Sequence, residues 1–174
     1  MKVSIYTDGA CKGNPGPGGW GCYYLYDDGS AFEFYGGEEN TTNNIMELKA
    51  AINGLINIKE DTTEITVYTD SKYVQQGITT WIEGWKAKNW KTSQNKPVKN
   101  VELWIELDAL VSLLGVKFEW VKGHGSDLNN HKADELAKGT LKNHIAYEKL
   151  YCKTYSKAKK AIGSINAAKF IQLE

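Results

Sequence analysis

The chain has 174 residues, with 21 lysines, no arginine and 21 acidic residues, so its formal net charge is zero. This length fits one domain with room for a hydrophobic core. No stretch approaches the roughly 18 consecutive apolar residues of a membrane span, and no signal peptide is recognisable at the start. We therefore expect a cytoplasmic protein without membrane contact. The cysteines Cys11, Cys22 and Cys152 lack metal-ligand spacing and are predicted to be reduced thiols.

The charge is unevenly distributed along the chain. Residues 1–140 hold 14 lysines and 19 acidic residues, whereas residues 141–174 hold seven lysines and two glutamates. We expect a domain over residues 1–141 and a lysine-rich, helical extension over residues 142–174. Because arginine is absent, phosphates would be contacted by lysines, backbone amides and neutral polar groups.

The first predicted strand covers residues 3–8 and ends at Asp8, because apolar and polar residues alternate along it. Residues 9–19 follow as a loop rich in glycine and proline. This loop suits either close contact between backbone amides and a ligand or a plain hairpin connection. Strands over residues 20–28 and 31–37 then predict a β-hairpin, so the sheet begins antiparallel.

A helix is predicted from Asn44 to about residue 58, with an apolar stripe at helical spacing. A row of small residues beside that stripe would let the helix lie close to a sheet, and Glu47 belongs to this row. Asn44 and Glu47 also have the spacing of a capping box. A capping role or a solvated position is therefore the alternative for Glu47.

The strand predicted at residues 65–70 repeats the alternation of the first strand and ends at Asp70. If the two strands are parallel neighbours, Asp8 and Asp70 end at the same height, roughly 5 Å apart along the backbone. Two carboxylates this close repel each other unless a proton or a divalent cation compensates, which favours a metal site. The alternative is that Asp8 opens a turn and Asp70 caps a helix.

Short helices are predicted over residues 71–77 and from about residue 79, and a segment rich in tryptophan and lysine follows. Residues 81–99 contain Trp81, Trp85, Trp90 and five lysines, with no acidic residue after Glu83. Aromatic rings interleaved with lysines suit a surface that stacks on sugars or bases and follows phosphates. A solvated lysine face over buried tryptophans is the alternative.

Asn100 is predicted to cap a helix that runs to residue 114, and residues 116–121 form the last predicted strand. The loop at residues 122–127 carries His124 between glycines, so we expect this histidine to be exposed. In the following helix Asp134 lies beside small alanines, as Glu47 does in its own helix. His131 and His144 are interpreted as surface residues.

The element order β-β-β-α-β-α-α-α-β-α and several motifs resemble type 1 ribonuclease H. The motifs that match are Thr7-Asp8-Gly9, Gly13-Asn14-Pro15-Gly16, Thr42-Asn43-Asn44, Met46-Glu47-Leu48, Thr69-Asp70-Ser71 with Tyr73-Val74, Trp81 with Trp85, Lys96-Pro97-Val98-Lys99-Asn100, Val121-Lys122-Gly123-His124 and Ala133-Asp134-Glu135-Leu136-Ala137. The resemblance covers residues 1 to about 140. It implies the α/β fold of ribonuclease H, a five-stranded mixed sheet with three antiparallel and two parallel strands and helices on both faces.

The resemblance also implies an endonuclease that hydrolyses the RNA strand of RNA/DNA hybrids and leaves 5′-phosphate and 3′-hydroxyl ends. By similarity, Asp8, Glu47, Asp70 and Asp134 would hold two Mg²⁺ or Mn²⁺ ions, and His124 would assist proton handling or product departure. We expect a monomer. The alternatives are a non-catalytic hybrid-binding module, an actin-like phosphotransferase, for which the chain is short, and a domain of a reverse transcriptase.

The resemblance assigns hybrid contacts as well. The RNA strand would meet Gly9, Cys11, Asn14 and Glu47, the DNA strand would meet Asn43, Asn44, Trp81 and Trp85, and Thr42 with Asn100 would hold a phosphate. From the basic segment, Lys86, Lys88 and Lys99 would contact the phosphate backbone of the hybrid. Two positions depart from the family pattern. His131 replaces a glutamate, which leaves the stability of the second metal position open, and Ile45 replaces a basic residue.

Overall fold

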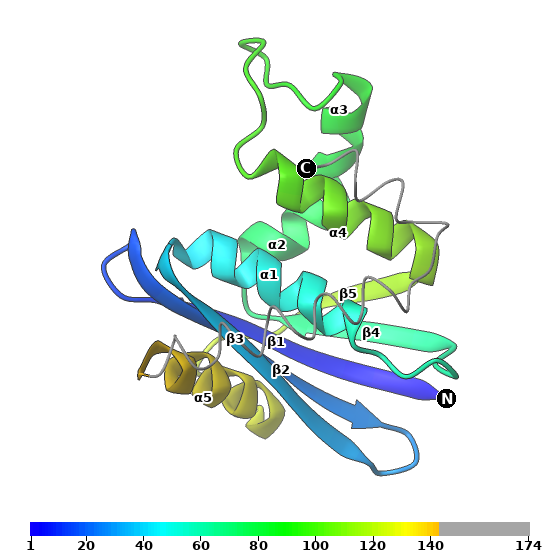
Figure 1. Ribbon diagram of the computed structural model, residues 1–174. Coiled ribbons are helices and arrows are strands. Elements are labelled where there is room, and N and C mark those ends of the chain that lie inside the picture. Colours follow the sequence, from blue (N-terminus) through cyan, green and yellow to red (C-terminus); the bar gives the residue numbers. More distant parts are fainter. Residues whose placement is uncertain (143–174) are drawn as a thin grey trace.

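The computed structural model describes residues 1–142, which form a five-stranded sheet with helices on both faces (Figure 1). The strands are β1 (Lys2–Cys11), β2 (Gly16–Tyr26), β3 (Ala31–Thr41), β4 (Glu64–Thr69) and β5 (Val116–Trp120). Their order across the sheet is β3-β2-β1-β4-β5. The first three strands are antiparallel, and β4 and β5 continue the sheet parallel to β1. The predicted fold class is confirmed.

The helices are α1 (Asn43–Ile56), α2 (Lys72–Gln76), α3 (Ile82–Ala87), α4 (Val101–Leu114) and α5 (Leu128–Lys142), and a π-helical turn, η1 (Gly77–Trp81), joins α2 to α3. α1 and α4 pack together on one face of the sheet, while α5 covers β1 and β2 on the other. α3 and the segment after it project away from the sheet at the top of Figure 1. Within residues 1–142, no helix is long and apolar enough to cross a membrane.

The first three strands are longer than the sequence predicted. Residues 9–19 were expected to be a loop, but β1 continues to Cys11, which lies opposite Gly18 on β2. β2 ends at Tyr26 rather than residue 28, and β3 continues to Thr41 rather than ending at residue 37. Glycines add no side chain to an apolar pattern, so periodicity could not reveal the end of β1 and the start of β2. The end of β3 is polar and likewise carries no apolar alternation. The structure supports the hairpin interpretation of residues 9–19.

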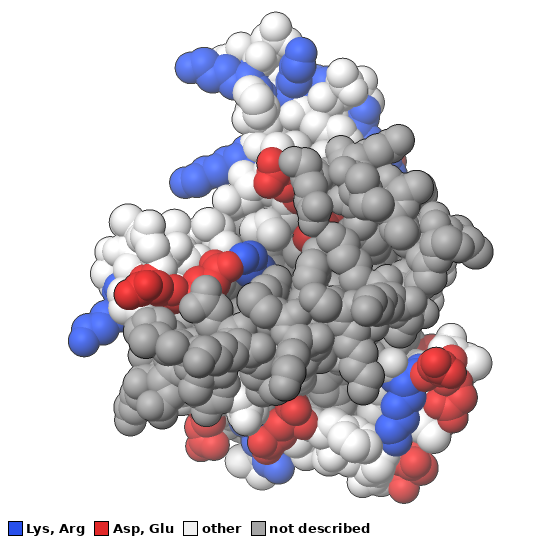
Figure 2. Space-filling view, in the orientation of Figure 1, with Lys and Arg blue, Asp and Glu red and all other residues white. Residues whose placement is uncertain are grey.

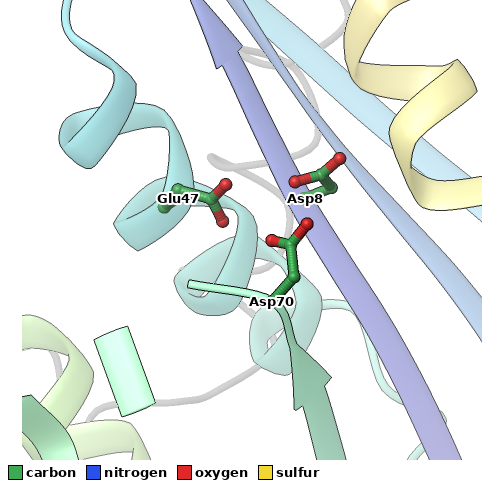
Figure 3. A group of neighbouring side chains, drawn as sticks. All are labelled: Asp8, Glu47 and Asp70. Carbon is green, nitrogen blue, oxygen red and sulfur yellow. The ribbon is translucent and has the colours of Figure 1, made fainter. Parts of the chain in front are cut away.

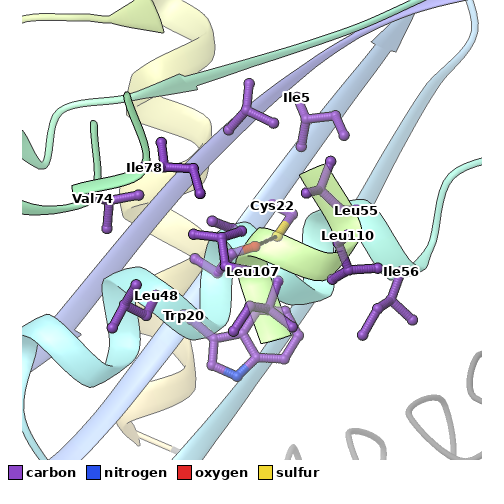
Figure 4. Close-up of a cluster of buried hydrophobic side chains, with 14 of the residues drawn as sticks. Ile5, Trp20, Cys22, Leu48, Leu55, Ile56, Val74, Ile78, Leu107 and Leu110 are labelled. Atoms are coloured by element: carbon purple, nitrogen blue, oxygen red, sulfur yellow. Dashed lines mark hydrogen bonds between the residues drawn. The ribbon is translucent and has the colours of Figure 1, made fainter. Parts of the chain in front are cut away.

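The hydrophobic core lies between the sheet and the layer of α1, α2 and α4 (Figure 4). Trp20 from the sheet, Leu48 from α1 and Leu107 from α4 are fully buried there. Full burial of one such side chain stabilises the fold by about 1.5–3 kcal/mol. Ala50 and Gly54, from the predicted row of small residues, are also buried, so α1 lies close to the sheet. The core therefore fixes the position of α1 relative to β1.

The extension predicted over residues 142–174 lies outside the described residues, except for Lys142 at the end of α5. Its predicted helix, and the interpretation of His144 as a surface residue, stay predictions.

Candidate active site

Three carboxylates meet where β4 ends beside β1 and α1 (Figure 3). Asp8, Glu47 and Asp70 each place an oxygen within 4.8 Å of the others. β1 and β4 are parallel, with Thr7 opposite Thr69, so Asp8 within β1 and Asp70 just after β4 lie at the same height. The predicted meeting of Asp8 and Asp70 is confirmed.

Other residues perform the capping roles that were the alternatives for Glu47 and Asp70. Ser71 Oγ accepts a backbone N–H at 3.2 Å and begins α2. Thr42 Oγ1 accepts the N–H of Ile45 at 3.3 Å and begins α1. The predicted capping box of Asn44 and Glu47 is therefore wrong. The helix begins earlier than the pattern indicated, and Glu47 lies buried beyond its first turn.

Two glycines set how closely the acid-bearing helices approach the sheet. A Cβ on Gly9 would lie 2.5 Å from the backbone nitrogen of Glu47 in α1. On the opposite face, a Cβ on Gly21 would lie 2.6 Å from the Cβ of Leu136 in α5. Any larger residue would push the helix away at either position. The depth of Glu47 and Asp134 in the fold therefore depends on these glycines.

Burial raises the pKa values of the three clustered carboxyls, and the charges of their neighbours raise those of Asp8 and Glu47 further. Burial, and then the charge of Asp70, raise the pKa of Asp8 to about 8. Burial and the charge of Asp8 raise the pKa of Glu47 well above its usual value, and within residues 1–142 its Oε2 is buried without a hydrogen-bond partner. Burial also raises the pKa of Asp70. A divalent cation fits this group, because its charge would let all three ionise together.

Asp134, on α5, is held differently from the other three acids. Its Oδ2 lies 2.9 Å from the ammonium nitrogen of Lys138, one helical turn later. Partial burial acts to raise the pKa of Asp134, but the bond to Lys138 opposes it and the pKa falls below its usual value. The sequence prediction included Asp134 and missed Lys138, although their spacing on a predicted helix is that of an ion pair.

One cavity of about 400 Å³ contains all five residues predicted to be catalytic. Its lining residues are Asp8, Gly9, Ala10, Cys11, Asn43, Glu47, Asp70, Ser71, His124, Asp134 and Lys138. His124 is exposed, as predicted, and its backbone is left-handed with φ of 54°. The structure brings these residues together, and their individual roles stay predictions.

The loop that carries His124 is tied to α5. His131 Nε2 lies 2.8 Å from the carbonyl oxygen of Gly125, and His131 is partly buried. His131 is therefore only partly at the surface, and its ring contacts the loop that carries His124. Asp127 Oδ1 accepts the backbone N–H of Asn129 at 2.9 Å, where α5 begins. Both contacts limit how far the loop can move from the cavity.

The predicted contacts of the RNA strand, and two of those predicted for the DNA strand, Asn43 and Asn44, lie near the carboxylates. Gly9, Cys11 and Asn43 line the cavity, and Asn14 Oδ1 accepts the N–H of Asn43 at 2.8 Å. Asn44 is exposed at the start of α1. The loop between β1 and β2 is thereby joined to the helix that carries Glu47.

The residues predicted to hold a phosphate, Thr42 and Asn100, have different surroundings. Asn100 lines a second cavity of about 420 Å³, together with Thr41, Ile45 and Lys49 among others. The Thr42 hydroxyl is engaged at the start of α1. A joint contact of Thr42 and Asn100 with a phosphate stays a prediction.

We call residues 81–99 the protrusion, and an aromatic cluster forms its base. The ring centroids of Trp81 and Trp85 are 6.0 Å apart, and those of Trp85 and Trp104 are 5.2 Å apart. The Tyr73 hydroxyl accepts hydrogen bonds at 3.1 Å from both Trp104 Nε1 and Asn100 Nδ2. Asn100 occupies the N-cap position of α4, as predicted, but its side chain makes no cap bond to the helix.

The lysines of the protrusion lie on its outer surface. Figure 2 shows basic side chains gathered over this part of the molecule, and Lys88 and Lys99 are exposed. Lys86 lies 3.3 Å from Asp108 of α4, so part of its charge is neutralised locally. Trp81 remains 38% exposed above the aromatic cluster. The protrusion thus combines partly packed tryptophans with solvated lysines. It has features of both sequence interpretations, the stacking surface and the lysine face over buried tryptophans.

Comparison with known proteins decides the family. The profile of the RNase H family matches residues 1–142. The chain belongs to the ribonuclease H family. Ribonuclease H of Bradyrhizobium diazoefficiens is 55% identical over 136 residues, which cover 78% of this chain and 87% of the relative. Ribonuclease H of a Caulobacter species is 54% identical over 142 residues, which cover 81% of this chain and 91% of the relative.

Solved structures of ribonucleases H have the same fold. The crystal structure of LC9-RNase H1, described as a type 1 RNase H with the type 2 active-site motif, matches with a TM-score of 0.72 and 30% identity. The match covers 82% of this chain and 73% of that one. LC11-RNase H1 in complex with an RNA/DNA hybrid matches in fold with a TM-score of 0.62 and 23% identity, over 82% of this chain and 99% of that one.

Proposed function

We propose that this member of the ribonuclease H family is an endonuclease that hydrolyses the RNA strand of RNA/DNA hybrids, leaving 5′-phosphate and 3′-hydroxyl ends. The observation that carries the proposal is the cluster of Asp8, Glu47 and Asp70 in a cavity shared with His124 and Asp134. A structural role does not explain this cluster, because buried acids at this distance repel one another.

We infer that Asp8, Glu47 and Asp70 hold one divalent ion and that Asp134, with Asp8, serves a second. The carboxylate oxygens suit Mg²⁺ or Mn²⁺, which prefer oxygen ligands, and the unpartnered Oε2 of Glu47 supports this fit. When bound, the ions would activate water and stabilise the leaving 3′-oxygen.

The chain's other residues would position the hybrid and move protons. His124 lies in the same cavity as the acids and can donate a proton to the leaving oxygen or accompany the product outward. Backbone and polar groups at Gly9, Cys11 and Asn14 lie beside the acids, where the 2′-hydroxyl would distinguish RNA from DNA. The protrusion would then contact the DNA strand, with Trp81 stacking on sugars and the lysines meeting phosphates.

We propose that the protein acts as a monomer in the cytoplasm. One chain supplies all five predicted catalytic residues to one cavity, which supports a monomer. Cys11 and Cys22 are both free thiols, which suits a reducing compartment.

Cleavage of an end-labelled RNA/DNA hybrid tests the proposed function, with Mg²⁺, Mn²⁺ or a chelator present. We expect cuts in the RNA strand of the hybrid only, no cuts with chelator, and 3′-hydroxyl ends that a ligase accepts. Duplex RNA and duplex DNA serve as controls. Equal cleavage of duplex RNA, or cleavage that persists without metal, would contradict the proposal. Tight hybrid binding with no cleavage would favour the non-catalytic binding module.

We further propose that residues 142–174 form a second phosphate contact, because seven lysines and two glutamates there follow an acidic domain. Ending the chain at Asn143 should leave cleavage at low salt intact and weaken hybrid binding. The slope of log affinity against log salt should flatten by about 1 to 3 units, since each phosphate held by a lysine adds roughly 0.9 to it. A lower melting temperature with an unchanged slope would instead assign the extension a structural role.

A further inference from the structure

Lys138 is the only lysine among the described residues that lines the carboxylate cavity. Its ammonium nitrogen lies 2.9 Å from Oδ2 of Asp134. Within residues 1–142, no such lysine partner is found for Asp8, Glu47 or Asp70. One of the four acids is therefore already paired with a cation before any metal arrives.

Stability does not account for the position of this ion pair. The side chain of Lys138 is 56% exposed, and exposed pairs contribute only about 0–1 kcal/mol. Lys2 and Glu64 form a comparable exposed pair at 3.3 Å, at the start of β1 and β4 and far from Asp8. The two pairs differ in what surrounds them. Lys138 adds a positive charge to a cavity whose other charged side chains include four acids.

We propose that Lys138 is a resident counter-ion of Asp134, which a divalent ion must displace before Asp134 can become its ligand. The inference rests on the proposed metal-dependent hydrolysis and adds a control on the order in which ions bind. Lys138 weakens metal binding at Asp134 in two ways. Its ammonium group covers Oδ2 of Asp134, and its charge repels an approaching cation.

Metal binding in the free protein should then occur in two unequal steps. The position formed by Asp8, Glu47 and Asp70 has no lysine to displace and fills first. The position at Asp134 fills at a higher metal concentration, or when a hybrid phosphate enters the cavity and offers the Lys138 ammonium a new partner. Lys138 is thus a positioning residue, because it acts through Asp134 and not on the reacting atoms.

Binding of Mn²⁺ to the free, full-length protein tests the inference, with free Mn²⁺ followed by electron paramagnetic resonance. Lys138→Met removes the charge and keeps an apolar stem of similar length. We expect it to bind the second, weaker equivalent of Mn²⁺ about threefold to tenfold more tightly, the scale of one removed like charge close by. Lys138→Arg should stay within about twofold of the wild type. The matched control, Lys2→Met, should bind as the wild type does.

Two outcomes overturn the inference. Equal Mn²⁺ affinity in Lys138→Met and the wild type would mean that Lys138 does not compete with the ion. Weaker binding in Lys138→Met would mean that Lys138 holds Asp134 ready for the metal. Asp70→Asn separates these failures from failure of the proposed function, because it should lose the tighter equivalent. If Asp70→Asn binds Mn²⁺ as the wild type does, the proposed metal site is wrong, and the proposed role of Lys138 is wrong as well.

Discussion

The carboxylate site and the protrusion serve one proposed substrate with opposite physical designs. Asp8 and Glu47 are buried, and parallel strands and a close glycine contact hold them in place. Lys88 and Lys99 are exposed on a segment that projects from the sheet. Chemistry at the site depends on the position of each oxygen, whereas attraction between lysines and phosphates depends mainly on charge. The contrast implies that cleavage and binding can be lost separately.

The largest expected effect is the loss of cleavage in Asp70→Asn. The variant keeps the shape of the side chain but removes one of three clustered charges, so the metal should be lost from the site. Removing negative charge should leave hybrid binding unchanged or improve it, because a phosphate approaches more easily. Cleavage rates and hybrid affinity are measured on the same preparation. Residual activity within about tenfold of the wild type, or ~1.4 kcal/mol of barrier, would contradict the metal assignment.

A smaller loss is expected for His124→Ala. His124 is exposed on a loop beside the acids, and it can assist proton transfer without holding an ion. We expect kcat to fall by roughly 10²-fold, the scale of a lost general acid or base, while the melting temperature stays the same. Steady-state kinetics measure this change. A loss as complete as that of Asp70→Asn would mean that His124 is a metal ligand.

In the protrusion, removal of two exposed lysines should weaken hybrid binding and leave cleavage unchanged. Lys88→Ala with Lys99→Ala should weaken hybrid binding and flatten the slope of log affinity against log salt by about 2 units, since each phosphate neutralised by a lysine adds roughly 0.9 to that slope. The rate at saturating enzyme should not change. Fluorescence anisotropy at several salt concentrations measures the slope. Lys2→Ala, at an exposed position on β1, is the control. If its salt slope changed equally, phosphate binding could not be assigned to the lysines of the protrusion.

The smallest expected effect is on the stability of the metal-free protein. The pKa of Asp8 is about 8 in the folded protein against a usual 3.8, so the folded state holds an extra proton between these values. The stability that this extra proton gives to the folded state is complete below pH 3.8 and is lost as the pH rises through about 8. Between pH 6 and pH 8.5 these two pKa values correspond to a loss on the order of 2–3 kcal/mol of stability. The melting temperature should therefore fall by about 4–12 °C, since 1 kcal/mol shifts it by about 2–4 °C in a protein of this size.

Two comparisons control for other titrating groups. Asp70→Asn removes the charge that acts on Asp8 after burial, so its melting temperature should fall less over the same pH range. Mg²⁺ should reduce the fall in the wild type, because the ion compensates the ionised acids. A wild type and variant with the same pH dependence would show that these acids do not repel one another in the folded protein.

Much of the site could be predicted from local patterns. Asp8 and Asp70 follow the same alternating pattern, and the register of β1 and β4 places them side by side, although β1 continues past Asp8. The order of the helices and strands was also predictable, because most carry clear apolar periodicity. Lys138 follows Asp134 at a spacing typical of helical ion pairs, so the sequence contained that signal too.

The remaining features depend on contacts between distant parts of the chain. Glu47 had the spacing of a capping residue, and only the close approach of α1 to Gly9 places it among the acids. Asn100 had the sequence of a cap, but its side chain bonds Tyr73, which lies 27 residues earlier. The glycine-rich ends of β1 and β2 lack an apolar pattern, so only their pairing identifies them as strands.

Single-turnover cleavage of a hybrid at increasing enzyme concentration tests the central claim most directly, because one experiment gives both the maximal rate and the half-saturating concentration. For Asp70→Asn we predict that the maximal rate falls by far more than tenfold. Hybrid binding, followed by anisotropy in the same samples, should be no weaker than in the wild type. For Lys88→Ala with Lys99→Ala we predict an unchanged maximal rate and a higher half-saturating concentration. If the lysine variant loses its maximal rate, or Asp70→Asn keeps it, cleavage and binding are not divided between the carboxylate site and the protrusion.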